Sequence, residues 1–306
     1  MTMTDTLEQT PEQTPAPAPA PALAAAAPGA NAHDEQILYI RPASGWAALD
    51  LREVWHFRDL LFTLAGRDLK LRYKQTALGA IWVVIQPLAA AGISTLVFGQ
   101  IAKMPSDGLP YFLFAFTGQL GWNLFSNTVS KASSSLIGNS HLISKVYFPR
   151  LILPLSGVPS TLVDFGVACL MMLFLFFTYH IVPGLALLLL PFWMAVLFAM
   201  GLGLGLVVSA LAVDYRDVNY IFPVFMQLLV YASPVAYGVS GIPASIRPYY
   251  DMNPASSILE GFRWSLIHTA APNGYNVAYA TCASLLILFA GAFAFKRMER
   301  RFADVV

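Results

Sequence analysis

Charged residues are scarce in this chain of 306 residues: Asp, Glu, Lys and Arg make up 11% of it, whereas hydrophobic residues make up 57%. Soluble domains carry roughly 25% charged residues. The formal net charge is only +1, so no excess of basic side chains points to nucleic acid as a partner. The composition therefore excludes an ordinary soluble domain and predicts an integral membrane protein.

Cysteine, clustered histidine and phosphate-binding motifs are also rare or missing. Cys169 and Cys282 both fall in apolar segments, where we expect them to act as small packing residues. The five histidines have no second ligand at metal spacing, so we expect no metal site. The sequence has no Gly-x-x-x-x-Gly-Lys-Ser/Thr motif, so we expect this chain to bind no ATP itself. No catalytic constellation is predicted.

Residues 1–45 differ in composition from the rest and include the tract PEQTPAPAPAPALAAAAPGA. Such a Pro/Ala-rich segment cannot bury a core, so we expect a disordered tail. It lacks a basic region ahead of an apolar core, so we do not interpret it as a signal peptide. Residues 46–306 are predicted to form one transmembrane domain.

Six apolar blocks predict six transmembrane helices, because a bilayer core needs about 20 apolar residues for each helical span. They lie at about 78–102, 111–130, 151–180, 185–213, 218–239 and 276–295. Lys and Arg collect before the first block and after the second, fourth and sixth, whereas the opposite side holds only Lys103, Arg247 and Arg263. Cytoplasmic loops carry the excess of cations, so both termini are expected to be cytoplasmic.

Two segments outside the blocks are predicted to be helical. Residues 50–65 place six apolar side chains on one broad side of a helix: Leu51, Val54, Trp55, Phe57, Leu61 and Phe62. This pattern predicts a helix that lies in the membrane interface, and an ordinary soluble amphipathic helix is the alternative. Four cations follow it and are expected to anchor it to anionic headgroups: Arg67, Lys70, Arg72 and Lys74.

Residues 240–274 are too interrupted by proline to span a membrane and too apolar for a free loop. We expect short re-entrant helices that dip into the outer leaflet and pack on protein. One of them should begin where Asn253 caps a helix and Pro254 takes its first position.

Asp164 is the one acidic residue deep in an apolar block. Ion-coupled transporters usually carry several such groups, so we expect energy from another source. A carboxyl that is hydrogen-bonded to Ser160 or Thr161 is the expected role, and a relay is the alternative.

Aromatic and uncharged polar side chains form three stripes at helical spacing. Aromatic faces stack on sugar rings and amides exchange hydrogen bonds with hydroxyls, so the stripes suit a polyhydroxylated substrate. Interhelical hydrogen bonds and aromatic belts are the alternative explanation. The candidate residues are Trp82, Gln86 and Gln100 in the first stripe, on the first block; Phe112, Phe116, Gln119, Asn123 and Ser126 in the second stripe, on the second block; and Tyr220, Gln227 and Tyr231 in the third stripe, on the fifth block.

Four motifs, LKLRYKQTALGAIWVVIQP, LISKVYFPRLILPL, DYRDVNYIFPVFMQLLVYASPVAYG and NPASSILEGFRW, resemble in order and spacing the membrane subunit of ABC-2 type polysaccharide exporters. The resemblance covers about residues 50–306. That family exports O-antigen, capsule and teichoic-acid type polymers across the bacterial inner membrane. The resemblance implies a homodimer with a channel at its axis, driven by two copies of a separate subunit that binds ATP and Mg.

The resemblance also implies a coupling helix within residues 138–150 that docks on the ATP-binding subunit. Without the resemblance, a short helix in a cytosolic loop would explain residues 138–150, and a local salt bridge would explain Arg216 and Asp217. The candidates for coupling are Asn139, Leu142, Ile143, Lys145, Tyr147, Phe148, Arg216 and Asp217. Pro87, Pro223 and Pro234 are expected to kink or interrupt their helices.

We therefore predict the transmembrane subunit of an exporter of lipid-linked polysaccharide. An ABC-2 exporter of a small hydrophobic drug or lipid is the alternative with the same architecture. A membrane-embedded glycan-processing enzyme is the alternative of a different class, for which only Asp164, Asp251 and Glu260 could serve.

Overall fold

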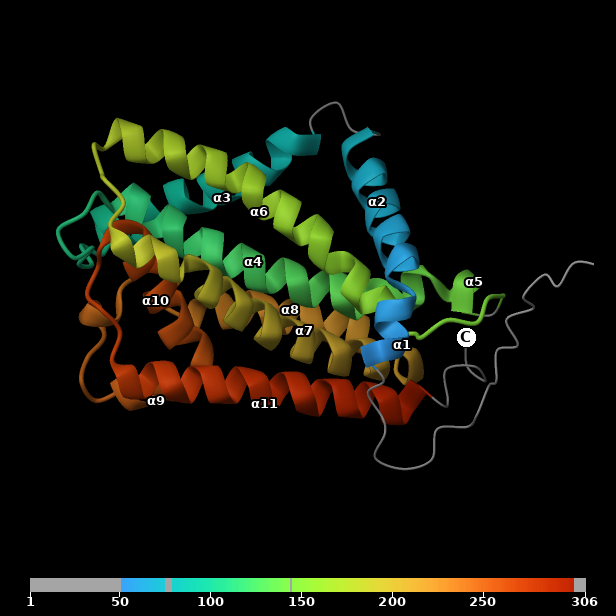
Figure 1. Ribbon diagram of the computed structural model, residues 1–306. Coiled ribbons are helices and arrows are strands. Elements are labelled where there is room, and N and C mark those ends of the chain that lie inside the picture. The colour runs from blue at the N-terminus through green and yellow to red at the C-terminus, as the bar shows by residue number, and fades with distance from the viewer. Residues whose placement is uncertain (1–50, 75–78, 144, 300–306) are drawn as a thin grey trace, which may run out of the picture. The chain divides into compact units, whose positions relative to one another are not determined.

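The computed structural model describes residues 51–74, 79–143 and 145–299, and the regular elements within them are all helical (Figure 1). The predicted tail at 1–45, the start of the first predicted span at 78, and the last cations, Arg300 and Arg301, lie outside these residues. The predicted all-helical class is confirmed for the described residues.

The helices follow one another with short connections. In chain order they are α1 (Leu51–His56), α2 (Arg58–Lys74), α3 (Gly79–Ser94), the π-helical η1 (Thr95–Ile101), α4 (Tyr111–Gly138), α5 (Ser140–Ile143), α6 (Ile152–Thr178), η2 (Leu185–Leu189), α7 (Leu190–Asp214), α8 (Val218–Tyr231), η3 (Val239–Gly241), α9 (Arg247–Met252), α10 (Pro254–Ile267) and α11 (Gly274–Met298).

Four segments of the described chain are helical, long and apolar enough to cross a membrane: Ile81–Ile101, Ile152–Thr178, Leu185–Asp214 and Gly274–Met298. They correspond to the first, third, fourth and sixth predicted blocks. Helix α4 has 28 residues but is more polar, because it carries the serine, asparagine and glutamine side chains of the second stripe. The count of six spans stays a prediction.

Helix α8 is shorter than its apolar block, which we expected to run from 218 to 239. It ends at Tyr231 after 14 residues, which is roughly 21 Å at 1.5 Å per residue. Pro223 lies inside α8 and Pro87 inside α3, so neither proline ends its helix. Pro234 lies in the turn after α8, where the chain leaves the helical direction.

The centre of the fold is built from α4 and α7, with α6 against α4 and α11 against α7. Small residues let these helices approach closely. A Cβ at Gly205 of α7 would lie 2.5 Å from Cβ of Ala132 on α4, and a Cβ at Gly203 would lie 2.6 Å from the backbone of α11 at Ile287. Gly203 and Gly205 of α7 therefore allow close packing against α11 and α4.

The helix predicted at residues 50–65 is present over the described residues as α1 and α2, which are separated at Phe57, and α2 continues to Lys74. Its place in the membrane interface stays a prediction. Figure 1 shows α2 running across the direction of α4, α6, α7 and α11. Val54, Phe57 and Leu61 contact the hydrophobic cluster that contains Phe148 and Phe295. Trp55 and Phe62, which we had placed on the same side, are exposed. Part of the broad apolar side therefore packs on the protein, and the rest is exposed on the surface of this chain.

The segment between α8 and α11 lies at the opposite end of the helices from α1 and α5 (Figure 1). The predicted start of α10 is confirmed: Ala255 N donates a hydrogen bond of 3.1 Å to Oδ1 of Asn253, and Pro254 is the first helical residue. Helix α10 packs against α4, α7 and α11. Its packing on protein is as expected, and its depth in a membrane stays a prediction.

Candidate functional site

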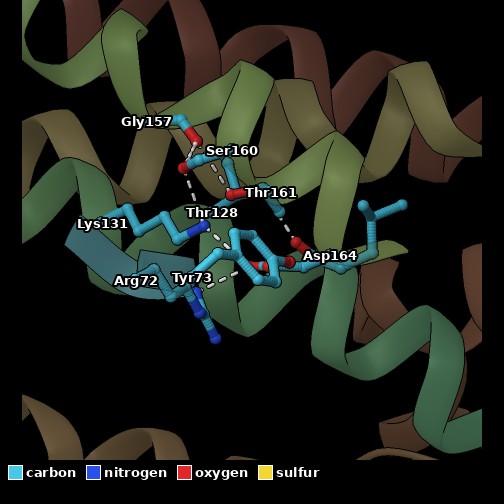
Figure 2. A network of polar contacts seen from close by, with 9 residues as sticks. Arg72, Tyr73, Thr128, Lys131, Gly157, Ser160, Thr161 and Asp164 are labelled. Carbon is cyan, nitrogen blue, oxygen red and sulfur yellow. Dashed lines mark hydrogen bonds and ion pairs between the residues drawn. The ribbon is translucent and has the colours of Figure 1, made fainter. Parts of the chain in front are cut away.

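A buried charged cluster joins three helices around Asp164 of α6 (Figure 2). Its side chain is 4% exposed. Nη1 of Arg72, from α2, lies 2.6 Å from Oδ2, and Nζ of Lys131, from α4, lies 2.9 Å from the same oxygen. The hydroxyl of Tyr73 donates to Oδ1 over 2.7 Å. Both carboxylate oxygens therefore have partners, and the two cations offset the cost of burying the charge.

The neighbours of Asp164 on α6 take part differently from our expectation. Ser160 accepts a hydrogen bond of 2.8 Å from Nζ of Lys131, and the Thr161 hydroxyl donates to the carbonyl of Gly157. Both hydroxyls donate to the Gly157 carbonyl and not to Asp164. The expected local hydrogen bonding of this carboxylate is thus replaced by partners from α2 and α4.

Tyr73 remains a donor over a wide pH range. Burial and the hydrogen bond to Asp164 raise the pKa of Tyr73 to about 12. The phenol therefore stays neutral and holds α2 on α6 at physiological pH. It adds a contact that does not depend on the charge of Arg72.

A small pocket opens beside the cluster. Its volume is about 30 Å³, which is enough for roughly one water molecule. Its polar lining comes from α2, α3, α4 and α6: Arg72, Gln86, Asn123, Asn127, Thr161 and Asp164. Gln86 and Asn123 belong to two different predicted stripes, so the fold brings these stripes together next to the charged cluster.

The other stripe residues have different degrees of exposure. On α3 and η1, Trp82, Gln86 and Gln100 are exposed, and on α8 so are Tyr220, Gln227 and Tyr231. On α4, Phe112, Gln119, Asn123 and Ser126 are half-buried. Phe116 is fully buried in the core of this chain, where it cannot face a substrate, so it does not belong to an exposed wall. The reason is that α4 is covered by other helices on the side that carries Phe116.

The predicted coupling segment comprises α5 and the turn that follows it. Lys145 and Tyr147 are exposed, and the Tyr147 hydroxyl donates to Oε1 of Glu53 on α1 over 3.5 Å. Leu142 and Ile143 contact the hydrophobic cluster of α1 and α2, and Phe148 is buried in it. The exposed and buried residues thus divide the segment into an outward surface and an inward support.

Asn139 faces inward. Its Oδ1 accepts a hydrogen bond of 2.6 Å from Nη2 of Arg67, and its Nδ2 donates to the Ser135 carbonyl. Arg216 and Asp217, in the turn before α8, are exposed. Asn139 therefore ties α2 to the start of α5 and offers little surface to a partner.

Of the four cations expected at the headgroups, two are exposed and two bind protein partners. Lys70 and Lys74 are exposed on α2. Arg67 pairs with Asp68 at 3.1 Å, and Arg72 pairs with Asp164. Half of the basic run therefore has protein partners.

The cluster around Asp164 was the part of the site that the sequence did not reveal. The signal was present, because a single carboxylate in an apolar block needs a cation. Lys131 lies 33 residues away and Arg72 lies 92 residues away, so nothing local identified them. Within the described residues, no group of three His, Cys, Asp or Glu side chains could hold a metal ion.

The apolar helices, the helix α2 that crosses them and the polar faces of α3, α4 and α8 define a multi-pass membrane protein of the transporter type. The chain belongs to the ABC-2 type transporter family, whose sequence pattern matches residues 59–267. Three related proteins match most of this chain. An O-antigen export system permease protein RfbA from Myxococcus xanthus is 28% identical over 258 residues, which is 84% of this chain and 98% of that protein.

The RfbA protein of Klebsiella pneumoniae is 26% identical over 81% of this chain and 95% of its own length. A polysialic acid transport protein KpsM from Escherichia coli is 21% identical over 76% of this chain and 91% of its own length. These relatives are permeases or transport proteins of polysaccharides by name, and each is similar to this chain over nearly its whole length.

Proposed function

We propose that this chain is the transmembrane subunit of an ATP-driven exporter, which moves a lipid-linked polysaccharide from the cytosolic to the outer side of the bacterial inner membrane. The observation that carries the proposal is the match over 98% of the length of an O-antigen export permease. The exposed amide and aromatic side chains favour a glycan over a small hydrophobic drug, because amides exchange hydrogen bonds with hydroxyls.

The wall of the channel is proposed to comprise exposed faces of α3 and α8. Trp82 and Gln86 lie on α3, and Tyr220, Gln227 and Tyr231 lie on α8. Large aromatic side chains with one polar end offer stacking without a deep binding site. Such a wall allows a sugar chain to keep moving. A second copy of this chain would close the channel on its other side.

Energy is proposed to come from two copies of a separate ATP-binding subunit, which would hold ATP and Mg. The outward residues Lys145 and Tyr147, together with Arg216 and Asp217, form the proposed contact with that subunit. Leu142, Ile143 and Phe148 support the contact from inside, since they join the hydrophobic cluster with α1 and α2. A push on α5 would therefore reach α2 through this cluster.

The membrane arrangement follows from the same proposal. Six spans would include α4 and the short α8, with both termini in the cytoplasm and α9 and α10 re-entrant on the outer side. The exposed residues Trp55, Phe62, Lys70 and Lys74 suit a helix at the headgroups, because aromatic and cationic side chains favour that depth. The cluster at Asp164 would hold this helix on the spans.

The first experiment identifies the partner. The chain is tagged in its native cell, the membrane is solubilised gently, and proteins that co-purify in stoichiometric amount are identified by mass spectrometry. A partner with a phosphate-binding loop is expected. Purification of this chain alone under several mild detergents would contradict the proposed energy source.

The second experiment tests the wall. Trp82→Ala and Tyr231→Ala are expected to reduce the polymer at the cell surface without loss of the ATP-binding partner. Phe177→Ala is the matched control, because Phe177 is an exposed aromatic residue of α6 outside the proposed wall. Normal surface polymer in both wall variants would exclude these residues from the channel.

A further inference from the structure

The end of α8 is held by side chains from several other elements. The last turn of a helix leaves four carbonyl groups without helical partners. Here the Tyr237 hydroxyl donates to the carbonyl of Tyr231 over 2.6 Å, and Nδ2 of Asn253 donates to that of Ala232 over 3.3 Å. The Tyr111 hydroxyl donates to the carbonyl of Ala236 over 2.9 Å. The turn after α8 is therefore fixed by α4, α10 and its own chain.

Arg263 of α10 holds the middle of this turn. Its Nη2 donates to the carbonyls of Pro234 and Val235, both over 2.9 Å, and the residue is 2% exposed. Its guanidinium lies 4.0 Å from the centre of the Phe114 ring on α4. The charge count of the sequence had placed Arg263 on the outer side and had given it no structural role. The structure instead buries it between α4, α10 and the turn.

The direct partners of Arg263 are carbonyl groups, and the carboxylates of Glu260 and Asp107 act on its charge from beyond ion-pair distance. None of the ion pairs of the described residues includes Arg263. A cation is favourable where the carbonyls of a helix end point, and a guanidinium can serve more than one acceptor at a time. The geometry thus ties the charge to one position of the turn.

Gly118 of α4 lies on the other side of the same turn. A Cβ at this residue would overlap the carbonyl oxygen of Val235 and would lie 2.5 Å from Nη2 of Arg263. Such an approach is closer than real Cβ atoms show, so only glycine leaves room for the turn. This is a second, independent sign that the position of the turn is specified.

The other end of α8 is held differently. Asp217 is the N-cap residue of α8, and its side chain makes no capping hydrogen bond. Arg216, Asp217 and Asn219 are exposed there. We propose that Arg263 is a positioning residue that fixes the Tyr231 end of α8, so that α8 pivots about this end when its Asp217 end is displaced. The consequence for export rests on the proposed function, which places Tyr231 in the channel wall.

The test measures the mobility of α8 directly in membranes, apart from export. Cys169 and Cys282 are replaced by alanine, and a spin label is attached to a cysteine at position 231 or at position 219. The electron paramagnetic resonance spectrum of each label is recorded. Arg263→Gln is expected to shift the spectrum of the label at 231 toward the line shape of a mobile label, while the spectrum of the label at 219 changes less. Arg263→Lys retains a cationic donor and is expected to restore part of the ordered line shape.

Gly118→Ala provides a second way to disturb the turn, which keeps Arg263 in place. It is expected to shift the label at 231 in the same direction. Gly166→Ala on α6 is the matched control, because a Cβ there meets no atom within 4 Å. If Arg263→Gln does not reach the membrane, Gly118→Ala decides. An unchanged line shape at 231 in every Arg263 and Gly118 variant that does reach it would overturn the proposal.

Surface polymer is measured in the same variants without labels. Loss of polymer together with mobility at 231 supports both the anchor and the wall. Mobility at 231 with normal polymer supports the anchor and removes Tyr231 from the wall. Loss of polymer with no change in mobility at position 231 would overturn the proposed role of Arg263.

Discussion

Asp164 and Arg263 are both buried charged residues, but the structure compensates them in different ways. Asp164 pairs directly with cations from α2 and α4, whereas the direct neighbours of Arg263 are two carbonyl groups and an aromatic ring, with Glu260 and Asp107 acting only at longer range. The side chain of Arg72 is 40% exposed, so this partner of Asp164 can regain water at little cost. Lys131 would still balance Asp164 if α2 moved away.

The two kinds of compensation differ in how easily the contact can separate. If the ion pair of Arg72 with Asp164 opened, the ion pair of Lys131 with Asp164 would stay in place. The two carbonyls at Arg263 have no such substitute, because loss of the guanidinium removes the donor that both of them share. We infer that the Asp164 cluster is a releasable contact for α2 and that the Arg263 turn is a fixed one.

Asp164→Asn should have the largest effect on stability. It leaves two cations beside a neutral amide, and breaking a buried ion pair in this way costs about 3 to 5 kcal/mol. The expected result is a strong fall in the unfolding temperature in mild detergent. Asp217→Asn is the control at an exposed position. If Asp164→Asn unfolded with the wild-type midpoint, the three-helix cluster would not contribute to stability.

The two cations of the cluster should differ, with Lys131→Met more damaging than Arg72→Gln. Lys131 has a 22% exposed side chain and also bonds Ser160, so its loss should cost about 2 kcal/mol or more. Arg72 is more exposed, and its loss should cost under about 1 kcal/mol, as for pairs near the surface. Unfolding midpoints compare the two. The reverse order would contradict the idea that α2 is the releasable partner.

Tyr73→Phe should remove a hydrogen bond to a charged acceptor, at about 1.5 kcal/mol. The raised pKa of about 12 in the folded protein also gives a pH effect. The folded state holds the phenol proton above the ordinary pKa, so the stabilisation from Tyr73 is full below about pH 10 and is lost as pH rises toward about 12.

The measurement for Tyr73 is the difference in unfolding midpoint between wild type and Tyr73→Phe as a function of pH. The difference should shrink as pH rises through this window. Tyr220→Phe is the control, because Tyr220 is an exposed tyrosine of α8. A difference that stayed constant up to pH 12 would place the titration elsewhere.

Asn253→Ala should have a small effect, about 1 kcal/mol. Asn253 caps α10 and also donates to the Ala232 carbonyl and to the Ser233 hydroxyl. The neighbouring bonds from Arg263 remain, so the turn should keep its position. Unfolding midpoints of Asn253→Ala and Asn219→Ala provide the comparison. A loss as large as that of Asp164→Asn would show that the cap, and not Arg263, holds the turn.

The sequence alone was sufficient where the physical cause is local. Apolar length located most helices, and the pair Asn253 and Pro254 marked the start of α10 correctly. The motif order identified the family that the match at residues 59–267 supports. The prediction from apolar length was wrong at α8, where the composition is apolar up to Gly238 but the helix ends at Tyr231. The end of α8 depends on donors from other elements, which no window of sequence contains.

The membrane class, the helical elements and the family of this protein follow from its amino-acid sequence, because hydrophobic length and local motifs act over a few turns of chain. The partners of the buried charges depend on the tertiary structure. Arg72 reaches Asp164 across 92 residues of sequence, and Arg263 reaches Val235 across 28. Such pairs form because a buried charge must find compensation in space, and the fold, not the spacing, decides which side chains are near enough to supply it.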